Sequence, residues 1–292
     1  MTEVPAIAQR HIDLYDEFTH GTMSWRDFME RLAKLAGSAA AAAALVQVLQ
    51  NNYAEAGIVP EDDDRLVTEV TTYEVDETTM SGHLSRLKGG GKRPAVIVIH
   101  ENRGLNPHIK DVARRTALEG FLAFAPDALS PIGGTPADED RAREMIYELD
   151  PDATLARMAA SVPLIAGHAE STGKVGAIGF CWGGGMVNKL AASGTSLAAG
   201  VPYYGRQIPV EEVPKVTAPL CLHYAGLDQR INTGIEEFVA ALKANQKTFE
   251  LHMYEDANHA FNNDTNEARY DIVAADLAWG RTIAFLQRYL GT

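Results

Sequence analysis

Residues 175–185 read Val175-Gly176-Ala177-Ile178-Gly179-Phe180-Cys181-Trp182-Gly183-Gly184-Gly185. We interpret them as a buried strand, a sharp turn at Cys181 and the entry to a helix over Met186–Ala192. The spacing is that of a nucleophile elbow, G-x-S-x-G, with a cysteine in place of the serine. Gly179 and Gly183 lack a Cβ atom, so strand and helix can pack closely while residue 181 occupies a strained, exposed corner. The alternative interpretation is a buried cysteine in a glycine-rich loop such as a phosphate cradle.

Composition narrows the class of protein. The chain has 292 residues, an ordinary hydrophobic share of 46% and a formal net charge of -13. This length accommodates one large α/β domain with an extension. The negative charge argues against nucleic acid or an anionic membrane surface as the main partner.

Cys181 and Cys221 are the two cysteines of the chain. Their number and spacing indicate neither a disulfide framework nor a zinc site, and we expect no metal and no cofactor. Cys221 lies in the apolar run Ala218–Tyr224, where we expect a small buried residue. A bridge between the two cysteines is the alternative, and it would abolish the chemistry of the proposed nucleophile.

Apolar runs alternate with helical patterns through most of the chain. The run Ala95–His100 is continuous and rich in β-branched residues, which is typical of a strand buried on both faces of a parallel sheet. Two strands, Leu66–Val75 and Met80–Leu87, precede it as a β-meander. The whole pattern predicts an α/β fold with a mostly parallel, doubly wound sheet. The other expected strands are Phe121–Ala125, Leu197–Tyr203, Pro219–Tyr224 and Thr248–Tyr254, and the other expected helices are His108–Glu119, Ala137–Leu149, Asp152–Ala169, Gly234–Ala244 and Asn266–Leu290.

The first part of the chain is expected to form a helical extension. Glu61-Asp62-Asp63-Asp64 is a charged linker, so we place the boundary between an extension, 1–60, and a main domain, 61–292. Ala6–Phe18 has helical periodicity, and Ser24 is expected to cap a second helix, with Asp27 three residues on.

The same region has features of an export leader. Ser24–Met29, the alanine-rich stretch Leu35–Leu49 and the small-x-small site Ala54-Glu55-Ala56 follow the order of a twin-arginine signal. Trp25, however, stands where the first arginine belongs, and the alanine stretch is too short and too weakly apolar for a membrane span. We therefore expect a retained extension and a cytoplasmic protein. A cleaved leader over residues 1–56 and a periplasmic protein are the alternative.

Polar residues that follow the predicted strands supply partners for the cysteine. Asp228 and His259 each come a few residues after an apolar strand. Reactive groups gather at the carboxyl ends of parallel strands. The order nucleophile, acid, histidine is then Cys181, Asp228 and His259. Asp256 is the alternative acid.

The remaining histidines are weighed by their position in the chain. His100 lies at a strand end next to Glu101 and is the second choice for a functional imidazole. Six of the others lie inside strands, near a helix end or before the core of the sheet, and we assign them no chemical role: His223, His252, His168, His11, His20 and His83.

From about Leu66 to its C-terminus, the chain resembles the dienelactone hydrolase (carboxymethylenebutenolidase) family, a branch of the α/β-hydrolases with a cysteine nucleophile. The strand-end glutamate together with the cysteine elbow is the specific part of the resemblance. The matching stretches are His100-Glu101-Asn102-Arg103-Gly104, Gly179-Phe180-Cys181-Trp182-Gly183-Gly184, Pro202-Tyr203-Tyr204-Gly205, Gly226-Leu227-Asp228 and Asn258-His259-Ala260-Phe261.

The resemblance implies a role for Glu101. Its carboxylate would pair with Cys181 in the resting state and raise the pKa of the thiol, against the helix N-terminus and His259, which lower it. Substrate would displace Glu101 and leave a thiolate aligned with His259. The oxyanion hole is expected to consist of the backbone N–H groups of Trp182 and Asn102.

The expected activity is hydrolysis of a small ester or lactone through a cysteine acyl-enzyme. Arg103, Arg206 and Arg230 are near strand ends and are candidates to bind a substrate carboxylate, and Tyr204 is a candidate pocket wall. Residues 261–264, which come shortly after His259, contain no arginine that could bind such a carboxylate. The alternative function is a non-catalytic binding or scaffold module that uses the extension as a partner surface, and a homo-oligomer is compatible with either.

Overall fold

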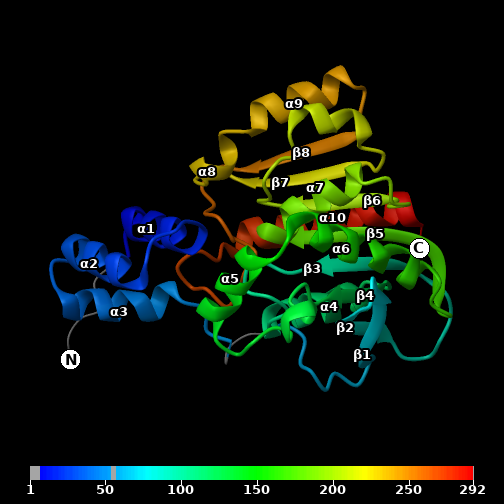
Figure 1. Ribbon diagram of the computed structural model, residues 1–292, viewed down its shortest axis with the longest axis horizontal. Helices are drawn as coiled ribbons and strands as arrows, with labels where there is room; N and C mark the ends of the chain where they lie inside the picture. The colour runs from blue at the N-terminus through cyan, green and yellow to red at the C-terminus, as the bar shows by residue number, and fades with distance from the viewer. Residues whose placement is uncertain (1–6, 54–56, 292) are drawn as a thin grey trace.

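An eight-stranded sheet forms the centre of the computed structural model, which describes residues 7–53 and 57–291 (Figure 1). The strand order is β1-β2-β4-β3-β5-β6-β7-β8. The β1–β2 and β2–β4 pairs are antiparallel, and the pairs from β4 to β8 are parallel. The predicted mostly parallel α/β sheet is therefore confirmed. The strands are β1 (Leu66–Val75), β2 (Thr78–Leu87), β3 (Arg93–Ile99), β4 (Leu122–Pro126), β5 (Ser171–Phe180), β6 (Ala199–Tyr203), β7 (Leu220–Ala225) and β8 (Phe249–Tyr254).

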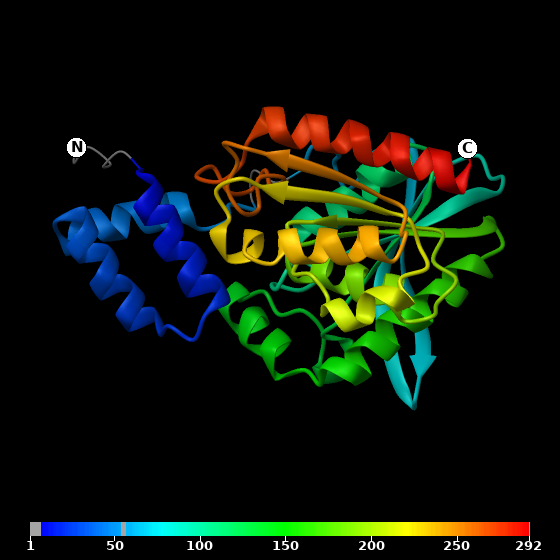
Figure 2. The same cartoon turned by 90° about the horizontal axis from the view of Figure 1, so that it is seen from above.

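Helices cover both faces of this sheet, as Figure 2 shows from above. On one face α6, α7 and α9 contribute to one buried apolar cluster, and on the other face α4 and α10 contribute to a second. The helices of the main body are α4 (Pro107–Leu118), α5 (Glu139–Glu148), α6 (Pro151–Ala166), α7 (Trp182–Ala192), α8 (Gln229–Asn232), α9 (Ile235–Ala244) and α10 (Ile272–Leu290), with short 3₁₀ turns at Ser130–Ile132 and Val210–Lys215.

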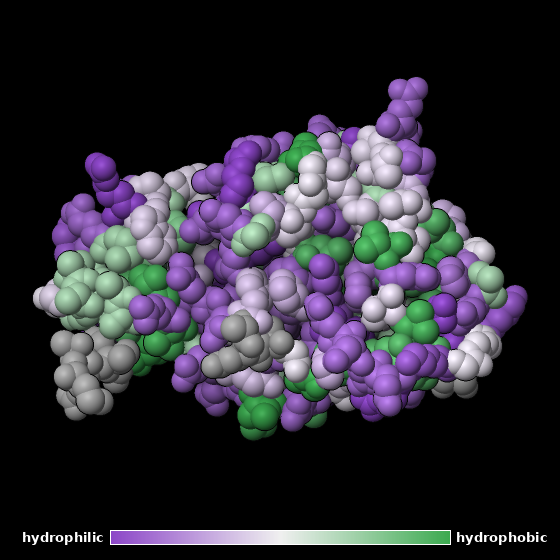
Figure 3. All heavy atoms as spheres, turned by 90° about the horizontal axis from the view of Figure 1, so that it is seen from below, coloured by the Kyte–Doolittle hydropathy of each residue, from purple (hydrophilic) through white to green (hydrophobic). Residues whose placement is uncertain are grey.

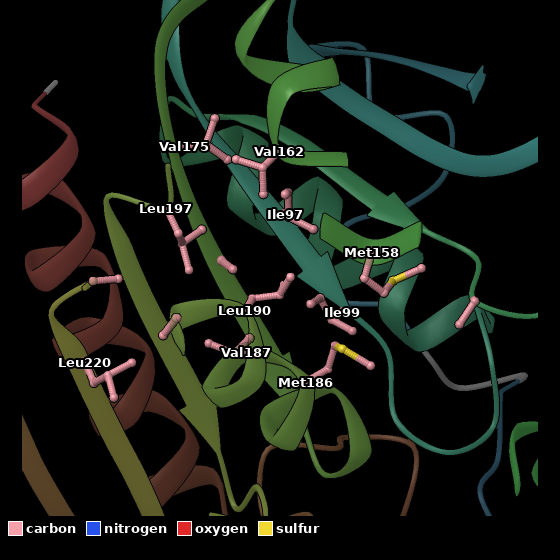
Figure 4. Close-up of a cluster of buried hydrophobic side chains, with 14 of the residues drawn as sticks. Ile97, Ile99, Met158, Val162, Val175, Met186, Val187, Leu190, Leu197 and Leu220 are labelled. Carbon is pink, nitrogen blue, oxygen red and sulfur yellow. The ribbon is translucent and has the colours of Figure 1, made fainter. Parts of the chain in front are cut away.

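Strand β3 illustrates why the centre of the sheet is apolar throughout. Ile97 and Ile99 belong to the cluster on one face, whereas Val96 and Val98 belong to the cluster on the other. Successive side chains of a strand point to opposite faces, so a strand with helices on both sides must be apolar at every position. In Figure 4, Ile97 and Ile99 point toward side chains from α6 and α7.

Three helices precede the sheet: α1 (Gln9–His20), α2 (Trp25–Ala36) and α3 (Ala39–Leu49). They bury an apolar core of their own that includes Phe18, Phe28 and Leu45. The predicted cap of the second helix is present, because the Ser24 side chain accepts a hydrogen bond from the Asp27 backbone N–H. These helices form one end of the molecule in Figures 1 and 2. On the face seen in Figure 3, moderately apolar residues gather at this same end.

The length and hydropathy of the helices indicate whether the described part of the chain contains a membrane span. No single helix there has the length and hydropathy needed to cross a bilayer. Taken together, α2 and α3 have the length and hydropathy of a span, but the two helices are bent by 110° at the break between them. The expected cleavage site Ala54-Glu55-Ala56 lies outside the described residues.

Several element boundaries differ from the sequence prediction, and two of the differences have a clear structural cause. Strand β5 begins at Ser171, before the apolar run, because Arg93 on β3 pairs with it there. The last helix begins at Ile272 and not at Asn266, and the Asp271 side chain caps it by accepting hydrogen bonds from two backbone N–H groups. The preceding segment folds into successive turns in which Asn263 and Asn266 are buried.

Candidate active site

Cys181 occupies the turn between β5 and α7 with φ 54° and ψ -112°, a conformation in which a residue with a side chain is strained. The two flanking glycines explain how the turn is built. A Cβ atom on Gly179 would lie 2.2 Å from the Gly183 carbonyl oxygen, and one on Gly183 would lie 2.4 Å from that of Ile99. The close approach of strand and helix therefore requires glycine at both positions.

His259 and Asp228 meet in the loops that follow β8 and β7. The Nδ1 atom of His259 lies 2.5 Å from Oδ2 of Asp228, and both residues are buried. This bond uses Nδ1, and the buried Nε2 of His259 has no hydrogen-bond partner among the described residues. A ring nitrogen of His259 lies within 4.8 Å of the Cys181 sulfur. Asp256, the alternative acid, is exposed and is not the partner of this imidazole.

The structure brings one unexpected residue to the cysteine. His20, the last residue of α1, places Nε2 3.1 Å from Sγ of Cys181. Its Nδ1 lies 3.0 Å from Oδ1 of Asp16, one helical turn earlier. The position of His20 before the sheet predicts no chemical role for it, and this contact with the sulfur differs from that prediction. The signal that would have drawn attention to it is the Asp16–His20 spacing, since residues i and i+4 share one face of a helix.

The two imidazoles dominate the electrostatics of the thiol. Burial raises the pKa of Cys181, but the effects of His20 and His259 outweigh burial, and the net result is a pKa lowered to about 6. Burial lowers the pKa of His259, but Asp228 and Cys181 raise it to about 10. Burial likewise lowers the pKa of His20, and Cys181 and Asp16 outweigh that effect, so the pKa is raised. Each of these shifts favours the charged form of its group, a thiolate at Cys181 and an imidazolium at His20 and at His259.

Glu101 follows β3 and lies beside the cysteine, but its hydrogen bond goes elsewhere. Both residues line one small cavity, in which the Glu101 Oε2 atom accepts a hydrogen bond of 2.8 Å from Nδ2 of Asn263. The expected resting pair of Glu101 and Cys181 is thus replaced in the structure, where the sulfur is hydrogen-bonded to His20. The sequence pattern does not indicate this role of Asn263, because it predicts a helix from Asn266, whereas the segment before Ile272 is folded into turns.

Trp182 and Asn102 each line a cavity together with Cys181. Trp182 is the first residue of α7, where backbone N–H groups have no partner within the helix. Asn102 is buried, and its side chain donates to the backbone oxygen of Thr19 at 3.0 Å. That bond fixes the Asn102 backbone next to the end of α1.

Two other residues selected from the sequence have structural partners. Arg103 is buried and donates to Oε2 of Glu139 at 2.6 Å and to the hydroxyl of Tyr15 at 2.9 Å. Its guanidinium thus has partners on α1 and α5, while Arg103 also lines the small cavity that contains Cys181. His100 has both ring nitrogens occupied, one by the Glu101 carbonyl at 2.6 Å and one by the Ala128 N–H at 3.1 Å. This leaves it no free nitrogen for chemistry.

A cavity of about 800 Å³ opens in front of the cysteine. Cys181, His20 and His259 line it at one end. Tyr204 also lines it, with its ring centroid 4.9 Å from that of His259 and its buried hydroxyl without a partner among the described residues. Apolar side chains from α5, α7 and α9 form much of the wall, and the charged residues that line it are Lys189, Arg206, Glu211, Arg230 and Glu237.

Two groups of side chains in the described part of the chain could hold a metal ion by geometry. One is His20, Cys181 and His259, whose donor atoms lie within 4.8 Å of one another. The other is Cys221 with Glu250 and His252. Burial raises the pKa of Cys221 to about 12, so this thiol stays protonated and is a poor metal ligand. Both cysteines are free, and the alternative disulfide is absent.

The sheet order, the strained cysteine elbow after β5 and the acid and histidine after β7 and β8 define an α/β-hydrolase. The model of the dienelactone hydrolase family matches residues 80–290, and the chain belongs to this family. It is accordingly a hydrolase of the ester or lactone type.

Known proteins similar to this chain agree with that assignment. A protein of Escherichia coli O157:H7 named "Putative carboxymethylenebutenolidase" is 32% identical over 250 residues, which are 80% of this chain and 92% of that protein. The crystal structure titled "Putative Dienelactone Hydrolase from Klebsiella pneumoniae" is 29% identical with a TM-score of 0.69, over 77% of this chain and 99% of that one. An acylaminoacyl peptidase of Pyrococcus horikoshii shares the fold at 15% identity and a TM-score of 0.60, over 77% of this chain and 42% of that one.

Proposed function

We propose that this enzyme hydrolyses a small ester or lactone through a thioester formed on Cys181, with His259 as the acid and base and Asp228 as its orienting carboxylate. The observation that carries the proposal is the buried Asp228–His259 pair, whose unbonded Nε2 faces a cysteine on a strained elbow. This arrangement has the parts of a nucleophile, base and orienter triad.

In the first half of the reaction the Cys181 thiolate attacks the carbonyl carbon. The C–S bond forms and the carbonyl electron pair moves onto oxygen, which the backbone N–H groups of Trp182 and Asn102 would stabilise. The bond to the alkoxy oxygen then breaks. Protonated His259 gives its proton to the departing alkoxide, which leaves as an alcohol, or remains attached as a hydroxyl if the substrate is a lactone.

In the second half neutral His259 takes a proton from water, and the resulting hydroxide attacks the thioester carbonyl. The tetrahedral adduct collapses, the C–S bond breaks and Cys181 leaves as a thiolate. The acid product then ionises in solvent. Asp228 holds the imidazole in the orientation that both halves need. Esters suit this chemistry better than amides because an alkoxide needs less acid assistance to leave than an amine.

The cavity indicates the shape of the substrate class. Its walls are mostly apolar, and Arg206 and Arg230 line it together with Cys181. We propose Arg206 as the residue that meets an anionic substituent. It is exposed, whereas Arg230 already binds Asp16, with Nε 3.2 Å from the carboxylate oxygen. Tyr204 would form the wall next to the acyl group.

Matched cysteine variants test the proposal. Full-length wild type, Cys181→Ala and Cys221→Ala are assayed with p-nitrophenyl acetate and a panel of lactones. Cys181→Ala should lose at least about a thousandfold in kcat/KM, a loss within the rate enhancements that enzymes supply. Cys221→Ala should keep the wild-type rate, because that thiol is buried away from the cavity. Equal rates for wild type and Cys181→Ala would contradict the acyl-enzyme.

The same proposal bears on the N-terminal region. Since α1 delivers Asp16 and His20 to the nucleophile, we propose that residues 1–60 are a retained extension of the catalytic domain and that the protein works in the cytoplasm. The mass of the protein purified from its native cell checks this. A mass that lacks the first 56 residues would instead show a cleaved leader.

A further inference from the structure

The end of α1 presents a second imidazole–carboxylate pair to the nucleophile. The family match covers residues 80–290, so Asp16 and His20 lie outside it. We propose that His20, oriented by Asp16, is a second catalytic histidine: as an imidazolium it is the standing counter-ion of the Cys181 thiolate, which leaves His259 to move the protons of leaving group and water. This inference rests on the proposed function and adds the N-terminal extension to the active site.

The geometry of the two histidines is closely parallel. In each, Nδ1 lies near an aspartate carboxylate, at 3.0 Å in His20 and 2.5 Å in His259. His259 is hydrogen-bonded to its aspartate side chain, whereas the Nδ1 of His20 is hydrogen-bonded to the backbone oxygen of Asp16 and has the carboxylate as its ion-pair partner. In each, Nε2 remains for the sulfur, and the His20 nitrogen makes the hydrogen bond, at 3.1 Å. The two rings contact each other edge to face, with centroids 4.6 Å apart. A carboxylate on Nδ1 fixes the orientation of an imidazole and stabilises its charged form.

Side chains of the main domain hold the end of α1 in place. The last carbonyls of a helix have no partner within the helix. Here Asn102 donates to the Thr19 oxygen at 3.0 Å, and Arg143 donates to that of Phe18 at 2.6 Å. His20 follows directly after these anchored residues. Its contact with the sulfur is therefore built into the way the extension docks.

The charges around the pair favour an ion pair over a neutral one. Asp16 keeps a pKa well below its usual value because His20, His259 and Arg230 outweigh the effect of its burial. Arg230 donates to the second oxygen of Asp16 at 3.2 Å. The other titratable groups near this site include Tyr147 on α5, Tyr204 after β6, Asp228 after β7, Glu101 and Arg103 after β3, and His259 and Arg269 after β8.

A separate counter-ion for the thiolate is useful because one histidine alone would have to both transfer protons and stabilise the departing sulfur. When His259 has given its proton to the leaving group, it is neutral and ready to take a proton from water. The sulfur must then depart as a thiolate when the thioester breaks. His20, which has kept its proton throughout, stabilises that thiolate as it forms. No proton is lost or gained at His20 over the cycle, and His259 ends as it began.

The test measures the thiol directly, without substrate. Full-length wild type, His20→Gln, His20→Asn and Asp16→Asn are alkylated with iodoacetamide across pH 5 to 10, in a Cys221→Ala background that leaves one thiol. Asp13→Asn is the matched control, because Asp13 is an exposed acid on the same helix. Both His20 variants should raise the thiol pKa by about one unit or more and slow alkylation at pH 5, below the wild-type pKa, by about tenfold. Asp16→Asn should give a smaller shift in the same direction.

Several outcomes would overturn the inference. One is an unchanged alkylation profile in both His20 variants while circular dichroism shows the wild-type helix content. Another is a shift of the thiol pKa in Asp13→Asn that is as large as the shift in Asp16→Asn, because this would indicate a general effect of the charge on the helix. If His20→Gln loses the fold of the extension, Asp16→Asn and His20→Asn carry the test. Failure of the proposed function would look different, because Cys181→Ala would then retain esterase activity whatever the alkylation shows.

Discussion

The guanidinium of Arg103 donates a hydrogen bond of 2.9 Å to the hydroxyl of Tyr15, so a residue just after β3 is bound to the first helix of the chain. Its other terminal nitrogen donates to Glu139 on α5 at 2.6 Å. Arg103 is buried, and one side chain thus links α1, β3 and α5 next to the cysteine. The position that resembles a substrate-binding site in sequence instead holds the N-terminal helices against the sheet.

Replacing this arginine should loosen the extension. Arg103→Met removes a buried charge-assisted pair and leaves Glu139 and Tyr15 without it, so we expect a loss of about 3 kcal/mol in the free energy of unfolding. Urea denaturation measures this loss. We also expect kcat/KM to fall, because His20 lies on the same helix as Tyr15. Arg141→Met is the control: Arg141 is exposed on α5 and binds Glu144 and Glu148 only at the surface, so its loss should cost less than about 0.5 kcal/mol. Equal stability of the two variants would contradict the linking role.

The elbow should be intolerant of one added methyl group. In Gly183→Ala the new Cβ would lie 2.4 Å and 2.5 Å from the carbonyl oxygens of Ile99 and His100, both of which are backbone atoms that cannot move aside easily. We expect a destabilisation of about 3 kcal/mol and a large loss of activity. Gly185→Ala is the matched change two residues on. Its Cβ would meet nothing closer than 3.5 Å, and alanine favours a helix by about 1 kcal/mol over glycine. Thermal unfolding of the two variants should therefore shift in opposite directions, and shifts in the same direction would contradict this account of the turn.

The sequence predicts the sheet and part of the site for a common reason. A strand such as Ala95–His100 must be apolar at every position when helices cover both its faces, and that constraint is visible in one segment alone. Asp228 and His259 can be predicted because the carboxyl ends of parallel strands meet at one edge of the sheet. The contact between Asp228 and His259 in the structure involves only the loops at that edge.

The contribution of His20 could not be predicted in the same way. It depends on how a separate bundle of helices docks, and the docking is set by contacts between residues far apart in the chain, such as Asn102 with Thr19. The helix itself was predicted from its periodicity, but not the surface on which it packs. The start of the last helix was wrong for a related reason: the segment before it follows the demands of buried side chains such as Asn263, which binds Glu101, rather than its own helical pattern.

The carboxylate of Glu101 should have only a modest effect on the thiol. Its hydrogen bond goes to Asn263 and the sulfur is bonded to His20, so Glu101→Gln removes a nearby negative charge without breaking a contact to Cys181. We expect iodoacetamide to alkylate the variant about two- to fivefold faster below the thiol pKa, since a negative charge disfavours a thiolate. Rates at pH 5.5 without substrate measure this. An increase well beyond tenfold would favour the direct pairing of Glu101 with Cys181, and a decrease would contradict any repulsion between them.

The pH dependence of kcat/KM should be bell-shaped and unusually wide. This ratio reports the ionisation of the free enzyme. The pKa of Cys181 is lowered to about 6, so activity should rise with pH through that value as the thiolate forms. The pKa of His259 is raised to about 10, so activity should fall above that value as the proton for the leaving group is lost. Initial rates with a chemically stable ester between pH 5 and 10.5 provide the profile, and Asp228→Asn should move its alkaline limb to lower pH because the carboxylate that stabilises the imidazolium is gone. An acid limb near the ordinary pKa of a free thiol, about 8.5, would contradict the activated cysteine.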